Sequence, residues 1–206
     1  MAKTGPEVLL LRHGQTEWSL NGRHTGSTDI PLTDEGREQA RALLDRLVGR
    51  DFALVLTSPL GRARETAELA GVGDRAQVRE GLTEWDYGEY EGVTTEEIRR
   101  RDPDWLLWRD GCPGGETAAD VGARVDRVIA EVRAADGDCA LFAHGHVLRV
   151  LAARWLDMAP EEGAHFGLST ATVSVMGWER EVPVFWLWNG AGHLGTTAGA
   201  GGAGSP

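Results

Sequence analysis

The sequence is poor in basic residues, and lysine is almost absent from it. Lys3 is the only lysine, and 21 basic residues stand against 32 acidic ones in the 206-residue chain, which gives a formal net charge of −11 at pH 7. This charge repels nucleic acid and anionic membrane surfaces at long range. We therefore expect neither as a partner, and an anionic ligand would have to be bound by cations gathered in one place.

Cysteine and long apolar runs are also scarce. The two cysteines, Cys112 in a Gly/Pro-rich loop and Cys139 at the start of an apolar run, belong to no CxxC pair or other metal-ligand spacing and make no disulfide framework. No apolar run reaches the length of a transmembrane helix, and residues 1–7 lack the basic and then apolar layout of a secretion signal. These absences predict a cytoplasmic protein.

The apolar residues that are present alternate between strand-like runs and helix-like stripes. Continuous apolar runs, typical of strands covered on both faces, occupy residues 7–11, 53–56 and 139–143. Helical spacing indicates helices over residues 34–48, 61–70, 117–135 and 146–157, and two further strands are expected at 172–178 and 182–188. This alternation predicts an α/β fold with a mainly parallel sheet.

The length and pattern indicate one domain over residues 1–189, with an inserted cap at about 94–116. Short helices are expected in the cap at 94–101, where Thr94 and Glu97 form a capping box, and at 104–109. The Gly-rich segment 190–206 is predicted to be a disordered tail. Its glycines satisfy GxGxxG, but no helix follows them, so we do not interpret the segment as a dinucleotide site.

Cationic or titratable residues follow each of the first three predicted strands. These are Arg12-His13-Gly14, Ser58-Pro59-Leu60-Gly61-Arg62 and His144-Gly145-His146. Because the carboxyl ends of parallel strands lie at one edge of a sheet, the three junctions should meet there, with the N-termini of the following helices. A single arginine at the end of a strand is explained equally well as a solvated surface residue. Together, the arginines and histidines predict a site for a phosphate dianion.

The residues at these junctions resemble the histidine phosphatase superfamily, whose phosphoglycerate mutase-like branch opens with a strand ending in RHGxT. The similar segments are Leu11–Trp18, Arg23–Gly26, Leu32–Gly36, Ser58–Thr66 and Ala143–His146. Segments 84–92 and 108–117 are most similar to small acid phosphatases and sedoheptulose-1,7-bisphosphatase. The resemblance implies a three-layer sandwich with helices on both faces of the sheet, and a phosphatase of small phosphorylated metabolites.

The resemblance also implies roles for five catalytic residues. His13 would be the nucleophile that forms a phosphohistidine, and Glu84 would protonate the leaving group and then activate water. Arg12, Arg62 and a protonated His144 would bind the three equatorial phosphate oxygens. This chemistry requires no metal and no cofactor.

Further substrate contacts are expected around this centre. Arg23, Thr25 and Gly26 match a loop that closes on the phosphate in relatives, and the remaining candidates are Gln15, Thr16, Ser19, Tyr87, Gly145, His146 and Arg149. Packing explains Tyr87 equally well, and a solvated helix face explains Arg149. Trp85, Trp105 and Trp108 are candidates for the pocket wall or for the core. The His144-x-His146 spacing suits a metal, but no third ligand accompanies it.

Two departures from the mutase pattern bear on the reaction. Ser19, with Asn21 nearby, stands where mutases carry an asparagine, and Glu84 is followed by Trp-Asp-Tyr instead of Arg-His-Tyr-Gly. The expected function is therefore a phosphomonoesterase acting on sugar phosphates or bisphosphates. Three alternatives remain open: a mutase that needs a bisphosphate primer, a metal-dependent hydrolase, and a phosphate-binding module without turnover. A homo-oligomer is compatible with the sequence.

Overall fold

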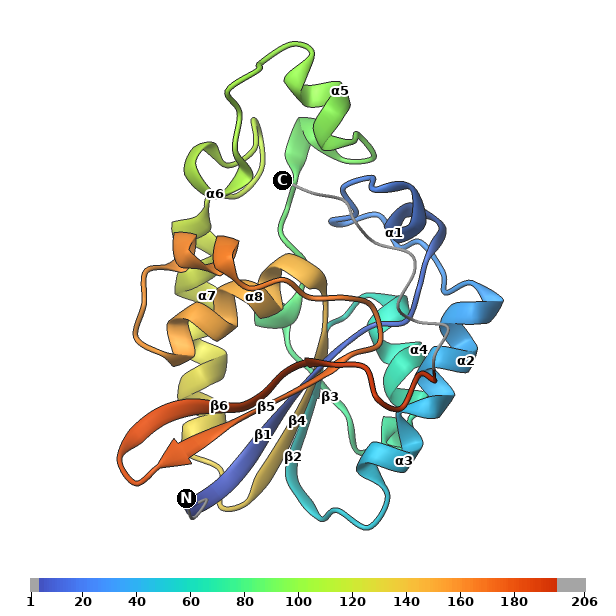
Figure 1. Ribbon diagram of the computed structural model, residues 1–206, viewed down its shortest axis with the longest axis vertical. Helices are drawn as coiled ribbons and strands as arrows, with labels where there is room; N and C mark the ends of the chain where they lie inside the picture. Colours follow the sequence, from blue (N-terminus) through green and yellow to red (C-terminus); the bar gives the residue numbers. More distant parts are fainter. Residues whose placement is uncertain (1–3, 196–206) are drawn as a thin grey trace.

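The computed structural model describes residues 4–195, and most of the predicted tail, residues 196–206, lies outside them (Figure 1). One six-stranded sheet has the order β3-β2-β4-β1-β5-β6. Its strands are β1 (Thr4–Arg12), β2 (Phe52–Thr57), β3 (Gln77–Val78), β4 (Asp138–Ala143), β5 (Val173–Glu179) and β6 (Val182–Gly190). The first four run parallel, and β5 and β6 are antiparallel to their neighbours. The predicted mainly parallel α/β fold is confirmed.

Helices cover both faces of the sheet, which makes the three layers that the resemblance implied (Figure 1). On one face lie α2 (Asp34–Ala42), α3 (Leu44–Leu47) and α4 (Gly61–Leu69), and on the other lie α7 (Ala118–Arg133) and α8 (Gly145–Trp155). Successive strand side chains alternate between the layers, as period two requires. Leu9 and Leu11 of β1 pack in the α2–α4 layer, whereas Val8 and Leu10 pack in the α7–α8 layer.

The predicted helix at 34–48 is two elements in the structure. Leu43 separates α2 from α3, and its N–H donates to the Ala40 carbonyl (3.2 Å), three residues back. The chain thus keeps a right-handed helical path through a tighter turn, and the two pieces follow the single apolar stripe. The sequence also gave no indication of the short helix α1 (Glu17–Asn21) or of the two-residue strand β3.

The inserted segment lies beyond the carboxyl ends of the parallel strands (Figure 1). It contains α5 (Thr95–Arg99), which begins with the predicted Thr94–Glu97 capping box, and α6 (Leu107–Asp110), which starts three residues later and ends one residue later than expected. Ile98 and Trp105 are buried in the same apolar cluster as residues of α7. The cap is therefore held over the sheet edge by a shared core.

Two glycines bring the start of α2 against the segment that follows β1. A Cβ atom at Gly14 would lie 2.2 Å from the Gly36 carbonyl oxygen, and a Cβ at Gly36 would lie 2.1 Å from the Gln15 carbonyl oxygen. No side chain fits at either position without moving the backbone. The approach fixes the turn that carries His13.

The last described residues are in contact with the sheet. Gly190 ends β6, and His193 Nε2 lies 2.8 Å from the Ala171 carbonyl oxygen. Among residues 4–195, no helix combines the length and the apolar character needed to cross a membrane.

Candidate active site

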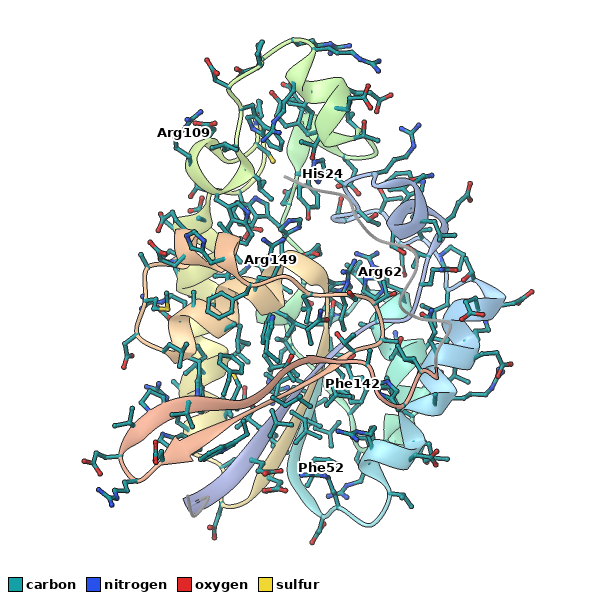
Figure 2. The ribbon with its side chains drawn as sticks, in the orientation of Figure 1. His24, Phe52, Arg62, Arg109, Phe142 and Arg149 are labelled. Atoms are coloured by element: carbon teal, nitrogen blue, oxygen red, sulfur yellow. The ribbon has the colours of Figure 1, made fainter. Side chains whose placement is uncertain are left out.

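The three strand junctions lie side by side at one edge of the sheet, because β2, β4 and β1 are neighbours in it. Arg12 pairs with Ala143 across β1 and β4, and Thr57 pairs with Phe142 across β2 and β4. The residues that follow each strand therefore emerge together. Figure 2 shows Arg62, Arg149 and His24 between this edge and the cap.

His13 is buried, with a side-chain arrangement that leaves one ring nitrogen free to react. Its Nδ1 lies 2.7 Å from the Gly14 carbonyl oxygen, which can only accept, so Nδ1 carries the proton and Nε2 carries the lone pair. Burial, followed by the charges of Arg62 and Arg12, lowers the pKa of His13 well below its usual value. The ring is thus neutral at pH 7, as a nitrogen nucleophile requires.

Arg12 carries a buried donor suited to an anion. Its Nη1 donates to the Leu168 carbonyl, which fixes the guanidinium. Its Nε is buried and has no partner among the described residues. A buried N–H without an acceptor costs about 1–3 kcal/mol, and a phosphate oxygen would satisfy it.

Arg62 lies on α4 and is fully buried. Its guanidinium was expected to bind phosphate, but in the structure it donates to other groups of the protein. Nη1 donates to the Thr28 carbonyl (2.9 Å), and Nη2 donates to the carbonyls of Thr25 (3.1 Å) and Gly26 (3.0 Å). Nε donates to His144 Nδ1 (3.0 Å). The guanidinium therefore holds the predicted phosphate loop by its carbonyls, and only the second N–H of Nη1 is left for another acceptor.

Glu91 holds the same loop by its N–H groups. One carboxylate oxygen accepts from Gly26 (2.9 Å) and Thr28 (3.0 Å), and the other accepts from Gly26 (3.0 Å). Glu91 stands in a segment that resembles the family, but its side chain received no role from the sequence. A carboxylate on the N–H side and a guanidinium on the carbonyl side fix the loop backbone at both kinds of polar group.

The state of His144 also differs from the expected protonated imidazole. Its Nδ1 accepts from Arg62, and its Nε2 lies 2.7 Å from Ser58 Oγ, so both nitrogens have partners. Burial, and then the charges of Arg62 and Arg12, lowers the pKa of His144 well below its usual value. The ring is therefore neutral in the free protein, because two nearby arginines already supply the positive charge.

Glu84 is buried at the N-terminus of α8. One carboxylate oxygen accepts from the N–H groups of Trp85 and Val147 (2.9 Å each), and the other accepts from His146 N–H (3.0 Å). The oxygen pair thus occupies the position where a helix presents its free N–H groups and its positive dipole end. These bonds fix the carboxyl group in the wall of the cavity that His13 lines.

This catalytic cavity has a volume of about 540 Å³. The predicted site residues that line it are Arg12, His13, Thr16, Ser19, Arg23, Thr25, Glu84, Tyr87, Gly145, His146 and Arg149. Four predicted residues are not among its lining: Gln15, Gly26, Arg62 and His144. Gln15 is instead bonded to the start of α2, where its side-chain oxygen accepts from Thr33 Oγ1 (2.9 Å).

Ser19 lines the cavity, but its hydroxyl caps a helix. Its Oγ accepts from Thr16 N–H (2.9 Å) and donates to the Thr16 carbonyl (2.8 Å), which completes the capping box of α1. Asn21 also lines the cavity, and its Oδ1 accepts from Arg23 N–H (3.3 Å). Ser19 and Asn21, the two candidates for the place of the mutase asparagine, thus both have local partners.

Tyr87 and His146 form a buried pair in the cavity wall. The Tyr87 hydroxyl lies 2.6 Å from His146 Nδ1, and burial lowers the pKa of His146 well below its usual value. A neutral His146 can therefore accept this hydroxyl hydrogen.

Within the part of the chain that the structure describes, no cluster of three or more His, Cys, Asp or Glu side chains is arranged to hold a metal ion.

His24 is a pocket residue to which the sequence assigned no role, although it stands within the matching segment Arg23–Gly26. Its ring lies 4.7 Å from that of Tyr87 and 5.8 Å from that of Trp105, measured between centroids. It lines the catalytic cavity and also a second cavity of about 740 Å³ under the cap. Tryptophans 105 and 108 line this second cavity, whereas Trp85 is fully buried in the core.

We predict that acid destabilises the fold through His24. Burial lowers the pKa of His24 from 6.5 to about 4. The unfolded chain therefore binds more protons between these values, and the stability that the neutral ring contributes is lost as pH falls from 6.5 toward 4. Between pH 7.5 and pH 5 this loss is about 2 kcal/mol for His24 alone.

Urea denaturation at the two pH values measures this loss. His24→Gln should reduce the difference between the unfolding free energies at pH 7.5 and pH 5 by about 2 kcal/mol, because the remaining buried histidines titrate in both proteins. An equal difference in the wild type and the variant would contradict the prediction.

Comparisons with known proteins identify the family of this chain. The profile of the histidine phosphatase superfamily (branch 1) matches residues 8–191. An acid phosphatase of Mycobacterium tuberculosis is 42% identical over 191 residues, which cover 90% of this chain and 93% of the relative. Sedoheptulose 1,7-bisphosphatase of Saccharomyces cerevisiae is 36% identical over 194 residues, covering 79% of this chain and 72% of the relative.

Solved structures give the same result. The product of open reading frame Rv3214 from Mycobacterium tuberculosis superposes with a TM-score of 0.87 at 40% identity, covering 92% of this chain and 100% of that one. A mycobacterial glucosyl-3-phosphoglycerate phosphatase superposes with a TM-score of 0.81 at 30% identity, covering 91% of this chain and 100% of that one. Because the profile spans nearly the whole chain and these relatives match along most of their length, the chain belongs to branch 1 of the histidine phosphatase superfamily.

Proposed function

We propose that this phosphatase is a metal-independent phosphomonoesterase that acts on small phosphorylated metabolites through a phosphohistidine, with sugar phosphates or bisphosphates as the leading substrates. One observation carries the proposal. His13, which is neutral and has the lone pair on Nε2, lines the same cavity as the cationic Arg12 and the carboxyl-bearing Glu84. These are a nucleophile, an anion-binding donor and a proton carrier.

In the first step, His13 Nε2 attacks phosphorus while the bond from phosphorus to the ester oxygen breaks. The protonated Glu84 gives its proton to the leaving oxygen, so the alcohol departs neutral. Arg12 stabilises the charge that spreads over the equatorial oxygens. In the second step, the Glu84 carboxylate takes a proton from water, the water oxygen attacks phosphorus, and the nitrogen–phosphorus bond breaks to release phosphate and restore His13.

The mutase alternative has support from relatives but less from the residues. A bisphosphoglycerate-dependent phosphoglycerate mutase of Gloeobacter violaceus is 31% identical over 171 residues. In this chain, however, the segment after Glu84 reads Trp-Asp-Tyr, and Trp85 is buried with its Nε1 donating to the Glu116 carbonyl (2.9 Å). Trp85 and Asp86, which stand where mutases carry Arg-His, do not line the catalytic cavity, whereas Tyr87 does.

Phosphate release from a substrate panel tests the proposal. The panel contains sedoheptulose 1,7-bisphosphate, fructose 1,6-bisphosphate, 3-phosphoglycerate and 4-nitrophenyl phosphate, each assayed with a metal chelator. We expect release that the chelator does not change, with a sugar bisphosphate hydrolysed at the highest kcat/KM. Loss of activity with chelator would favour the metal-dependent hydrolase. Transfer of phosphate only with an added bisphosphoglycerate primer would favour the mutase, and silence under all conditions would favour a binding module.

A further inference from the structure

The cavity under the cap continues from the catalytic cavity. The two share four lining residues, His24, Thr95, His146 and Arg149, so a ligand whose phosphate lies near His13 extends past them. The volume of about 740 Å³ is larger than that of the catalytic cavity, and residues 105–109 of the cap are part of its lining. Under the proposed function, this second cavity is where the leaving alcohol lies; we call it the leaving-group chamber.

The chamber has an apolar wall, and part of it is exposed. Trp105 and Trp108 line it together with Leu106, which is 43% exposed although it is a large apolar residue. Trp108 packs edge-on against Trp85, with ring centroids 5.5 Å apart, so its position is fixed by the core. A ring or another broad carbon face gains burial against such a wall, whereas a short polyol chain gains little.

Arg149 lies across this wall. Its guanidinium carbon is 4.6 Å from the centroid of the Trp108 ring, which is a cation–π distance. Its Nε donates to the Gly163 carbonyl (3.1 Å) and its Nη2 donates to the Ala164 carbonyl (3.0 Å). These bonds fix the fork, and neither uses Nη1. Figure 2 shows Arg149 below the cap, close to α8.

Arg149 also differs in its charge balance from Arg109, which lines the same chamber. The Arg109 guanidinium is bonded to the Asp110 carboxylate at 2.7 and 2.8 Å. Arg149 bonds only carbonyl oxygens, and within residues 4–195 it has no carboxylate at ion-pair distance. Burial lowers the pKa of Arg149 only to about 10, so the group is cationic at neutral pH. The chamber's one carboxylate, Glu161, is exposed.

We propose that Arg149 and the Trp108 wall form a leaving-group subsite that selects phosphate monoesters whose alcohol has a ring and carries a second anionic group, a carboxylate or a phosphate. This inference rests on the proposed function, because it assigns the alcohol of the same reaction to the chamber. Arg149 is the specificity-determining cation, and Nη1 of its guanidinium donates to the second anion. The ring of the alcohol packs on the exposed apolar side chain of Leu106 beside Trp108.

Two matched pairs of substrates test the subsite and name the anion. The carboxylate pair is 4-carboxyphenyl phosphate and 4-carbamoylphenyl phosphate, which have nearly the same shape and differ in charge. The phosphate pair is fructose 1,6-bisphosphate and fructose 1-phosphate. In each pair we compare kcat/KM of the ester with the second anion to kcat/KM of the ester without it. For the kind of anion that the subsite binds, this ratio should be about ten or more in the wild type, as a charge-assisted hydrogen bond allows.

Arg149→Gln should reduce that ratio to about one, and Arg149→Lys should retain part of it. The matched control is Arg109→Gln, which removes an arginine from the same chamber but one whose charge Asp110 already balances; the ratio should keep its wild-type value. A merely structural role of Arg149 would lower both members of a pair equally and keep the ratio, which would overturn the inference. If the wild type hydrolyses neither these esters nor any member of the panel above, the proposed function itself has failed.

Discussion

His13→Asn is expected to lower kcat by about 10³-fold or more and to abolish labelling of the protein by substrate phosphate. Removal of a covalent nucleophile has effects of this size. Asparagine is the sharpest replacement because its amide nitrogen can still donate to the Gly14 carbonyl, as His13 Nδ1 does. The fold of the turn is thus kept while the Nε2 lone pair is lost.

The measurement is a rapid quench with labelled substrate, followed by treatment of the protein with acid or base. A phosphohistidine is labile in acid and stable in base, unlike a phosphoserine. His165→Asn is the matched control, because His165 is exposed on the 3-10 helix Pro160–His165 and lines neither cavity. It should leave kcat within about twofold of the wild-type value. Acid-labile label on His13→Asn would place the nucleophile elsewhere.

Glu84→Gln is expected to lower kcat by about 10²- to 10³-fold for alkyl phosphates and by much less for 2,4-dinitrophenyl phosphate. An alkoxide needs a proton as it departs, whereas dinitrophenolate leaves without one. The amide oxygen can accept from Trp85 and Val147, but the amide NH₂ then meets His146 N–H, so the variant also loses about 1–3 kcal/mol of stability. Denaturation of the variant measures this cost separately.

The dependence on the leaving group separates proton donation from a structural effect. Glu91→Gln is the matched control, since its carboxylate also accepts backbone N–H groups, those of Gly26 and Thr28, but does not line the catalytic cavity. This variant loosens the loop and should slow all esters by a similar factor. An equal loss for alkyl and dinitrophenyl esters in Glu84→Gln would contradict the proton-donor role.

The order of strands and helices could be predicted because burial leaves a periodic signal along the chain. The apolar runs before Arg12, Ser58 and His144 indicate covered parallel strands, and the polar residues directly after them gave the position of the candidate site. The helix at 34–48 was predicted as a single stripe because the tight turn at Leu43 does not disturb its apolar period. The strand β3 has two residues, too few for a period.

Only the tertiary structure shows the hydrogen-bond partners and protonation states of the polar side chains. The sequence identifies Arg62 and His144 as cationic or titratable residues at the right junctions, but only the folded loop shows that the Arg62 fork bonds Thr25, Gly26 and Thr28. It also shows that His144 is neutral, since its pKa depends on burial and on charges far away in the sequence.

The sequence by itself determined the family and the layered fold and predicted the residues of the candidate site, because strand periodicity and short motifs are local properties of the chain. Only the tertiary structure decided that Glu91 holds the phosphate loop and that His24 joins two cavities. It alone also placed Arg149 over Trp108 with no carboxylate to balance its charge. The physical reason is that hydrogen-bond partners, burial and cavities arise from segments distant in sequence, and no local pattern records which of them meet.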